Sequence, residues 1–234
     1  MEYIPKTKNI SHIDLIKQIL KGDIVSLSRA ITLVESQKKS DRDIANKILK
    51  ECLLKKNSSI RIGITGVPGV GKSTFIESFG SYLSETGKKI AVLAVDPSSS
   101  VTKGSILGDK TRMENLVRDK NVYIRPTPAG NHLGGVSNKT RESIILCEAA
   151  GFDIILIETV GVGQSEISVY EMVDYFLLLK LAGAGDELQG IKRGIIEMAD
   201  SIIINKSDGD NIKAANLAKS EFKMALNLYP LKAS

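Results

Sequence analysis

The chain has 234 residues, 42% of them hydrophobic and 25% charged, a balance typical of a folded globular protein rather than a disordered or fibrous one. No apolar run approaches the roughly 18 residues that cross a membrane, and the first residues lack the apolar stretch of a secretion signal. We therefore expect a cytoplasmic protein with no membrane partner. Cys52 and Cys147 lie in helix-like apolar patterns and are predicted to be reduced core residues.

The net charge is +5, and the whole excess lies in the first 58 residues. A basic segment of this kind can bind nucleic acid. This one contains a single aromatic residue, Tyr3, and its lysines are scattered around predicted helices. The pattern favours a solvated helical surface, and we predict no nucleic-acid partner.

The segment 11–55 carries apolar residues at helical spacing and is predicted to form two or three amphipathic helices. Asp41 precedes one of the apolar stretches and is predicted to cap its helix. A short polar break at 57–59 marks a boundary between an N-terminal helical extension, 1–58, and a second domain, 59–234. We expect the apolar faces of the extension to pack on that domain rather than on a membrane.

After the break, short apolar runs alternate with helix-like stretches. This alternation predicts an α/β fold with a mostly parallel sheet flanked by helices. The predicted strands are 60–65, 90–95, 122–124, 154–157, 176–179 and 202–204. The predicted helices are 72–86, 137–150, 189–199 and 211–227.

A complete phosphate-loop motif follows the first predicted strand and begins the first predicted helix, which is the context that a P-loop NTPase requires. Glycines let the backbone turn its N–H groups onto phosphate oxygens, and the helix N-terminus adds its positive dipole end. Lys72 is predicted to reach the β- and γ-phosphates, and Ser73 to ligate Mg²⁺. The predicted nucleotide-binding residues here are Gly66, Val67, Pro68, Gly69, Val70, Gly71, Lys72, Ser73 and Thr74.

A second nucleotide motif, Asn205, Lys206 and Asp208, follows the last predicted strand. Ligands of open α/β sheets bind at this carboxyl end of the strands. A carboxylate at Asp208 can accept hydrogen bonds from both N1–H and the exocyclic amine of guanine, whereas adenine has an unprotonated N1. The motif therefore favours GTP over ATP.

The apolar run 154–157 ends in Glu158, with Gly161 three residues later. An acid at this place is predicted to hold Mg²⁺, and the Gly161 amide to sense the γ-phosphate, so that 159–170 forms a nucleotide-sensitive switch. Asp96 and Asp109 are further candidate metal residues beside Ser73 and Glu158. Lys72, Ser73, Glu158 and Gly161 form the predicted catalytic group.

Many GTPases position the attacking water with a glutamine directly after the switch glycine, but this chain has Val162 there and Gln164 nearby. We therefore expect slow hydrolysis that needs a partner to complete the site. The glycine-rich, charged loop 183–193 follows the fifth predicted strand and is proposed as a third switch.

The segments GVPGVGKST, AVDPSSS, GSILGDKTRM, ETVGVGQSE, GAGDELQGIKRGI and NKSDGDN resemble the MeaB/ArgK family of methylmalonyl-CoA mutase-associated GTPases, which belong to the SIMIBI class. The resemblance covers most of 60–230. It implies a GTPase chaperone that gates cofactor loading into an adenosylcobalamin-dependent mutase and protects or reactivates it. By motif position, it implies an Mg²⁺ site at Ser73, Asp96, Asp109 and Glu158, and switch coupling by Arg112, Gln164, Asp186 and Lys192.

Two departures from the family pattern stand out. Ala182 replaces the usual proline before the third switch, which should loosen that loop, and Lys180 interrupts an apolar strand. The family also continues beyond the position of Ser234 with a last strand, a guanine-backing loop and helices of the dimer interface. We therefore expect a shortened chain in which the family's homodimer is in doubt.

Three alternatives remain at this point. A SIMIBI metallochaperone would carry a His-rich or Cys–His metal site, whereas this chain has only His12 and the distant loop residue His132. The same sequences carry an older label as kinases of an amino-acid transport system. A third alternative is a module that binds nucleotide or the mutase without turnover.

Overall fold

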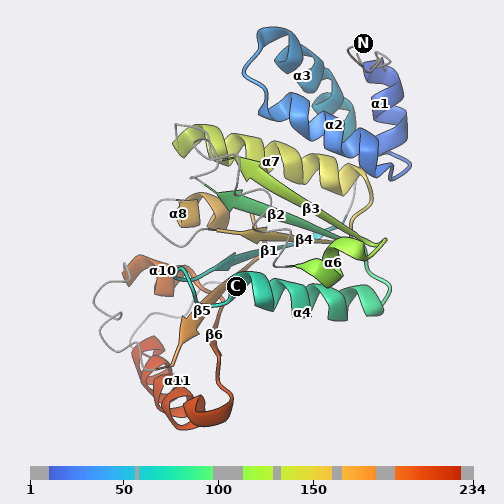
Figure 1. The fold of residues 1–234 in the computed structure, drawn as a ribbon. Coiled ribbons are helices and arrows are strands. Elements are labelled where there is room, and N and C mark those ends of the chain that lie inside the picture. The colour runs from blue at the N-terminus through green and yellow to red at the C-terminus, as the bar shows by residue number, and fades with distance from the viewer. Residues whose placement is uncertain are drawn as a thin grey trace, which may run out of the picture.

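Six parallel strands form one sheet in the order β3-β2-β4-β1-β5-β6 (Figure 1). The computed structural model describes residues 11–55, 58–96, 113–128, 133–159, 165–182 and 193–227. All six predicted strands and the parallel sheet are confirmed, although β3 continues four residues beyond its predicted end. The strands are β1 (Ile60–Thr65), β2 (Ile90–Asp96), β3 (Val122–Pro128), β4 (Ile154–Glu158), β5 (Tyr175–Leu181) and β6 (Ser201–Asn205).

Helices cover both faces of the sheet. One apolar layer joins α4 (Lys72–Glu85) and α6 (Glu114–Arg118) to the strands, and α7 (Leu133–Ala149) and α8 (Ser165–Tyr170) lie on the other face (Figure 1). The sequence predicted α4 closely, placed the start of α7 four residues late, and did not predict the short helices α6 and α8. Towards the end of the described chain lie α10 (Arg193–Met198), the 3₁₀ turn Gly209–Asn211 and α11 (Ile212–Leu226).

Three helices precede the sheet: α1 (His12–Ile19), α2 (Ile24–Glu35) and α3 (Lys39–Leu53). Ser11 and Asp23 cap the first two helices by accepting hydrogen bonds from Asp14 N and Ser26 N. The prediction that Asp41 caps α3 is wrong. That helix begins at Lys39, and Asp41 lies in its first turn, where its carboxylate accepts a hydrogen bond from Ser36.

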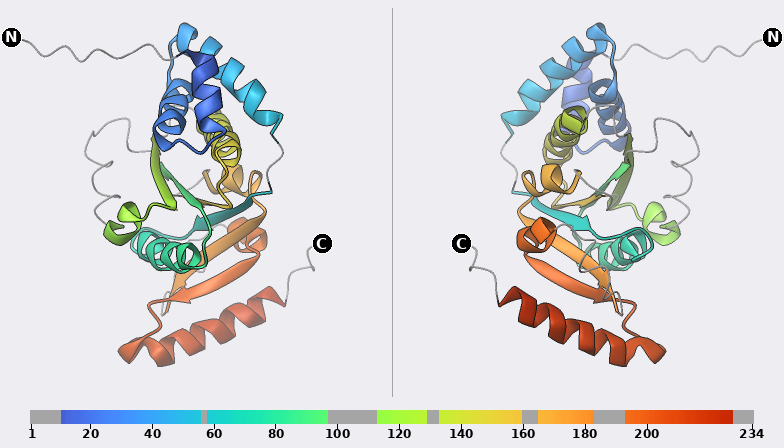
Figure 2. Two further views of the ribbon diagram at one scale, coloured as in Figure 1. Left: turned by 90° about the vertical axis from the view of Figure 1, so that its right-hand side faces the viewer. Right: turned by 90° about the vertical axis from the view of Figure 1, so that its left-hand side faces the viewer.

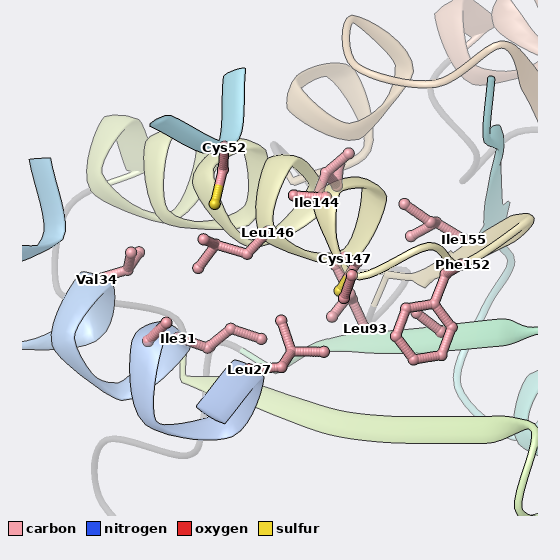
Figure 3. Packing of buried hydrophobic residues seen from close by; sticks show 14 of the residues in the cluster. Leu27, Ile31, Val34, Cys52, Leu93, Ile144, Leu146, Cys147, Phe152 and Ile155 are labelled. Atoms are coloured by element: carbon pink, nitrogen blue, oxygen red, sulfur yellow. The ribbon is translucent and has the colours of Figure 1, made fainter. Parts of the chain in front are cut away.

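The extension shares one continuous core with the sheet. In Figure 3, Leu27, Ile31 and Val34 of α2 face Leu146 and Cys147 of α7, and Cys52 of α3 reaches the same layer. This confirms that the apolar faces of α1, α2 and α3 pack on the sheet and α7. Both cysteines are free and buried, and burial raises the pKa of Cys52 to about 11, which makes its thiol unreactive at neutral pH.

Polar contacts add a second link between the extension and the sheet. Arg125 of β3 forms an ion pair with Glu35 at the end of α2 and donates a 3.2 Å hydrogen bond to Thr32. Lys139 of α7 donates to the backbone oxygen of Glu35 at 2.7 Å, and Tyr123 donates to Ser28 at 3.3 Å. The carboxyl end of α2 is therefore neutralised by two cations, as the helix dipole favours.

At the opposite end of the molecule, α11 lies beside the edge strand β6 (Figure 2). Phe222 of α11 packs with Leu178 of β5 and Ile196 of α10. The unexpected Lys180 is only 1% exposed, and its ammonium group lies 5.6 Å from the ring centroid of Phe222. Within the described residues, no helix is both long and apolar enough to cross a membrane.

The Glu35–Arg125 pair predicts a measurable contribution to stability. Glu35→Gln keeps the shape of the side chain but removes its negative charge. The guanidinium of Arg125, which is 21% exposed, then lacks an opposite charge to offset the cost of its burial. We expect the free energy of unfolding to fall by about 1–3 kcal/mol in urea denaturation. Glu51→Gln, at an exposed carboxylate of α3, is the matched control and should change it by less than about 0.5 kcal/mol. Equal losses in the two variants would contradict this assignment.

Candidate nucleotide-binding site

The predicted phosphate loop connects the end of β1 to the start of α4. β1 ends at Thr65, and α4 begins at Lys72, as the sequence predicted. Within the turn, Val70 N donates to Val67 O at 3.2 Å, while Pro68 and Gly69 lie exposed. Thr74 is also exposed, in the first turn of α4. The loop thus leads directly into a helix N-terminus, the arrangement that favours phosphate binding.

The side chain of Lys72 is directed back toward the phosphate loop that precedes it. Its ammonium group donates to Gly66 O at 2.7 Å and to Val67 O at 3.3 Å, and the residue is 8% exposed. Burial lowers the pKa of Lys72, and the nearby carboxylates of Glu158 and Glu166 partly offset that effect. The site therefore keeps its cation poorly solvated, which strengthens its attraction for a phosphate that enters.

Ser73 and Glu158 meet as the sequence predicted. The Ser73 hydroxyl donates to Glu158 Oε1 at 3.2 Å, joining the first turn of α4 to the end of β4. A hydroxyl and a carboxylate oxygen are the hard ligands that Mg²⁺ prefers, so this pair fits the predicted metal. Ser73 and Glu158 are the described residues that would hold the ion.

The predicted guanine motif contacts the phosphate loop directly. Asn205 Nδ2 donates to Val70 O at 2.8 Å, and Lys206 Nζ donates to Gly69 O at 2.9 Å. Lys206 adopts a positive φ of 53°, which turns the chain sharply after β6. The side chain of Asp208 is exposed just beyond this turn. The two motifs, 134 residues apart between Gly71 and Asn205, thus form one site.

Several predicted residues lie outside the described parts of the chain. Asp96 ends β2, but its side chain is not described. The other such residues are Asp109, Arg112, Gly161, Gln164, Asp186 and Lys192. Their roles in metal binding, phosphate sensing and switch coupling stay predictions.

Two features of the site were not predicted from the sequence. Glu166 of α8 is fully buried and close enough to Lys72 to affect its pKa. Thr159 donates a 2.8 Å hydrogen bond to Thr65, and both residues are buried. The strand register pairs Ile64 with Glu158, so the positions of these threonines could have been inferred only once the pairing of β1 with β4 was known.

The sheet order, the loop geometry and the joined motifs define this chain as a P-loop NTPase. Residues 27–233 match the family model for methylmalonyl Co-A mutase-associated GTPase MeaB. The chain belongs to this family, as the sequence motifs indicated.

The similarity extends to individual proteins. A probable GTPase of Mycobacterium tuberculosis is 57% identical over 213 residues, 91% of this chain and 63% of that protein. GTPase ArgK of Escherichia coli is 50% identical over 213 residues, again 91% of this chain and 64% of ArgK. The crystal structure of a LAO/AO transport system kinase is 38% identical, with a TM-score of 0.81 over 100% of this chain and 68% of that one. The chain therefore spans somewhat less than two thirds of the length of these curated relatives.

The backbone of Leu179 approaches Gly66 so closely that we predict no other residue is tolerated at this position. Its φ is 149°, and a Cβ there would lie 2.5 Å from the backbone oxygen of Leu179. At Gly69, φ is 82° but a Cβ would meet nothing within 4 Å. Both alanine variants carry backbone strain of about 1–3 kcal/mol. In Gly66→Ala, the new Cβ also clashes with the backbone oxygen of Leu179. We expect the midpoint of urea unfolding and the affinity for GDP to fall further in Gly66→Ala than in Gly69→Ala, and the reverse order would contradict this geometry.

The buried environment of Lys72 predicts an alkaline loss of GDP affinity. Because burial lowers the pKa of Lys72 below the ordinary 10.5, the group loses its charge at a lower pH than an exposed lysine. Only the ammonium form attracts phosphate strongly, so affinity should fall as the pH rises through that lowered pKa. The unfolded chain holds this proton more tightly, so the stability of the nucleotide-free protein should rise over the same window.

Fluorescence titration with labelled GDP between about pH 7 and 10 would measure the affinity. Lys72→Gln is the control, because its remaining pH dependence reports the titration of the guanine base and of other groups. We expect it to bind about 10–100-fold more weakly at neutral pH. Parallel pH profiles for the wild type and this variant would contradict the prediction.

Proposed function

We propose that this chain binds GTP and hydrolyses it to GDP and phosphate as part of a chaperone of an adenosylcobalamin-dependent mutase. The observation that carries the proposal is the contact of Asn205 with Val70 O, which joins a guanine motif to a phosphate loop in one site. The phosphate loop supports nucleotide binding in general, and Asp208, three residues after the Asn205 that contacts the loop, supports guanine in particular.

The proposed reaction is in-line attack of water on the γ-phosphorus, which breaks the bond to the β-phosphate oxygen and releases GDP. Lys72 turns from its loop carbonyls to the phosphates and neutralises charge there, together with the backbone N–H groups of the loop. Mg²⁺, when held by Ser73 and Glu158, supplies further charge neutralisation on the phosphate oxygens. We propose that the 3.2 Å contact between these two side chains prepares that site.

The family name, which specifies association with methylmalonyl-CoA mutase, supports the proposed partner. We propose that Arg112, Gln164, Asp186 and Lys192 couple the mutase to hydrolysis, and that Asp96, Asp109 and Gly161 complete the site. The division into an extension, 1–58, and a nucleotide-binding domain, 59–234, belongs to the same proposal. The cytoplasmic location and the doubtful homodimer stay predictions.

The decisive experiment measures phosphate release from GTP by this chain in Mg²⁺, with and without an adenosylcobalamin-dependent acyl-CoA mutase. We expect slow turnover alone and stimulation of at least about tenfold by the mutase. Lys72→Ala should abolish both rates, whereas Lys213→Ala, at an exposed lysine of α11, should leave the unstimulated rate unchanged.

Each contrary result bears on one part of the proposal. Equal competition by ATP and GTP would contradict guanine recognition. GTP binding without release of phosphate would favour a binding module. Turnover that no such mutase changes would contradict the proposed partner while leaving the GTPase itself intact.

A further inference from the structure

Two buried threonines connect the strands that carry the phosphate loop and the metal carboxylate. Thr65 is the last residue of β1, and Thr159 directly follows the end of β4. They are 1% and 0% exposed, and the Thr159 hydroxyl donates to the Thr65 hydroxyl at 2.8 Å. A buried hydroxyl pair of this kind is costly to open, because either group alone would lack a partner.

The pair lies at the last point of contact between the two strands. β1 and β4 run parallel with Ile64 opposite Glu158, and Thr159 N donates to Ile64 O at 3.0 Å. One residue further, Gly66 begins the phosphate loop. The hydrogen bond between the two threonine hydroxyls is therefore the last contact between β1 and β4 before β1 leads into the phosphate loop.

The threonine pair and the Ser73–Glu158 contact lie on opposite faces of the sheet. Neighbouring residues of a strand point to opposite faces, so Thr159 shares a face with Ile157, and Glu158 shares the other with Leu156. Ile157 belongs to the core beneath α7 and α8, whereas Leu156 belongs to the core that α4 covers. The end of β4 is thus attached to β1 on one face and to α4 on the other.

We propose that the Thr65–Thr159 hydrogen bond positions Glu158 against Ser73 and so sets the affinity of the nucleotide site for Mg²⁺. We assign both threonines a positioning role, since their hydroxyls bond to each other and the proposed Mg²⁺ ligands are Ser73 and Glu158. When the hydroxyl bond is lost, the Thr159 N–Ile64 O bond remains, but the end of β4 is held less firmly and the carboxylate of Glu158 is less well positioned against Ser73. The inference rests on the proposed nucleotide binding and extends it to Thr65 and to Thr159, the first residue of the predicted switch 159–170.

The test compares the affinity for GDP in Mg²⁺ with that in EDTA, and takes the ratio as the readout. Thr159→Val keeps the shape of the side chain and removes the hydroxyl, and should lower this ratio by roughly three- to tenfold. Thr159→Ser restores the hydroxyl and should stay within about twofold of the wild type. Thr65→Val should match Thr159→Val, and the double variant should be no worse than either single one, because the two groups act as one unit.

Thr140→Val is the matched control. Thr140 is 1% exposed in α7, and its hydroxyl has no hydrogen-bond partner in the part of the chain that the structure describes. This substitution should leave the Mg²⁺ ratio unchanged. Thermal melting of every variant reports general loss of stability, which by itself would weaken binding equally in Mg²⁺ and in EDTA.

Three results would overturn the inference: an unchanged ratio in Thr159→Val, an equal loss in Thr159→Ser, or equal weakening in Mg²⁺ and EDTA. If Thr159→Val does not fold, Thr65→Val and Thr65→Ser make the same comparison from the other end of the bond. A wild-type chain that binds no GDP would overturn the proposed function and this inference together. Normal wild-type binding with any of the three results would overturn the positioning role alone.

Discussion

Parallel pairing of β1 with β4 on one side and β5 on the other is the constraint on which the whole site depends. Because all the strands run in the same direction, the phosphate loop, Glu158 and Asn205 reach one edge of the sheet, although 139 residues separate Gly66 from Asn205. β5 holds β6 beside it, and the Asn205–Val70 hydrogen bond then closes the site across the sheet edge. The apolar strands supply the energy of assembly, and the polar strand ends supply the chemistry.

The helical extension is built onto this sheet as part of the same core. Its apolar stripes face α7 (Figure 3), and the lysines of its three described helices lie exposed on the other side. The Arg125–Glu35 pair connects α2 to β3, and Lys139 binds the same helix end. The extension therefore contacts β3 directly. β3 pairs with β2, which ends in the predicted metal residue Asp96.

Burial of charge is the main electrostatic feature of the site. Lys72 lies among its own loop carbonyls with Glu158 and Glu166 nearby, so groups of the protein itself stabilise its cation. An entering phosphate must compete with these groups and gains from a low local dielectric when it does. The buried charge of Lys180 is stabilised differently. Its ammonium group lies near the ring of Phe222, where β5 and α11 meet.

The sequence by itself determined the six strands and their order along the chain, the phosphate loop, the guanine motif and the approach of Ser73 and Glu158 to a common site. These depend on local periodicity, on short motifs, and on the rule that parallel strands end at one edge. Only the tertiary structure decided that α3 begins at Lys39 rather than behind an Asp41 cap, because Ser36 already engages that carboxylate. It alone also decided that Glu166 lies near Lys72 and that Thr159 bonds to Thr65. Such contacts join residues from different elements, and their partners are chosen by strand register and helix packing, which no local pattern of residues records.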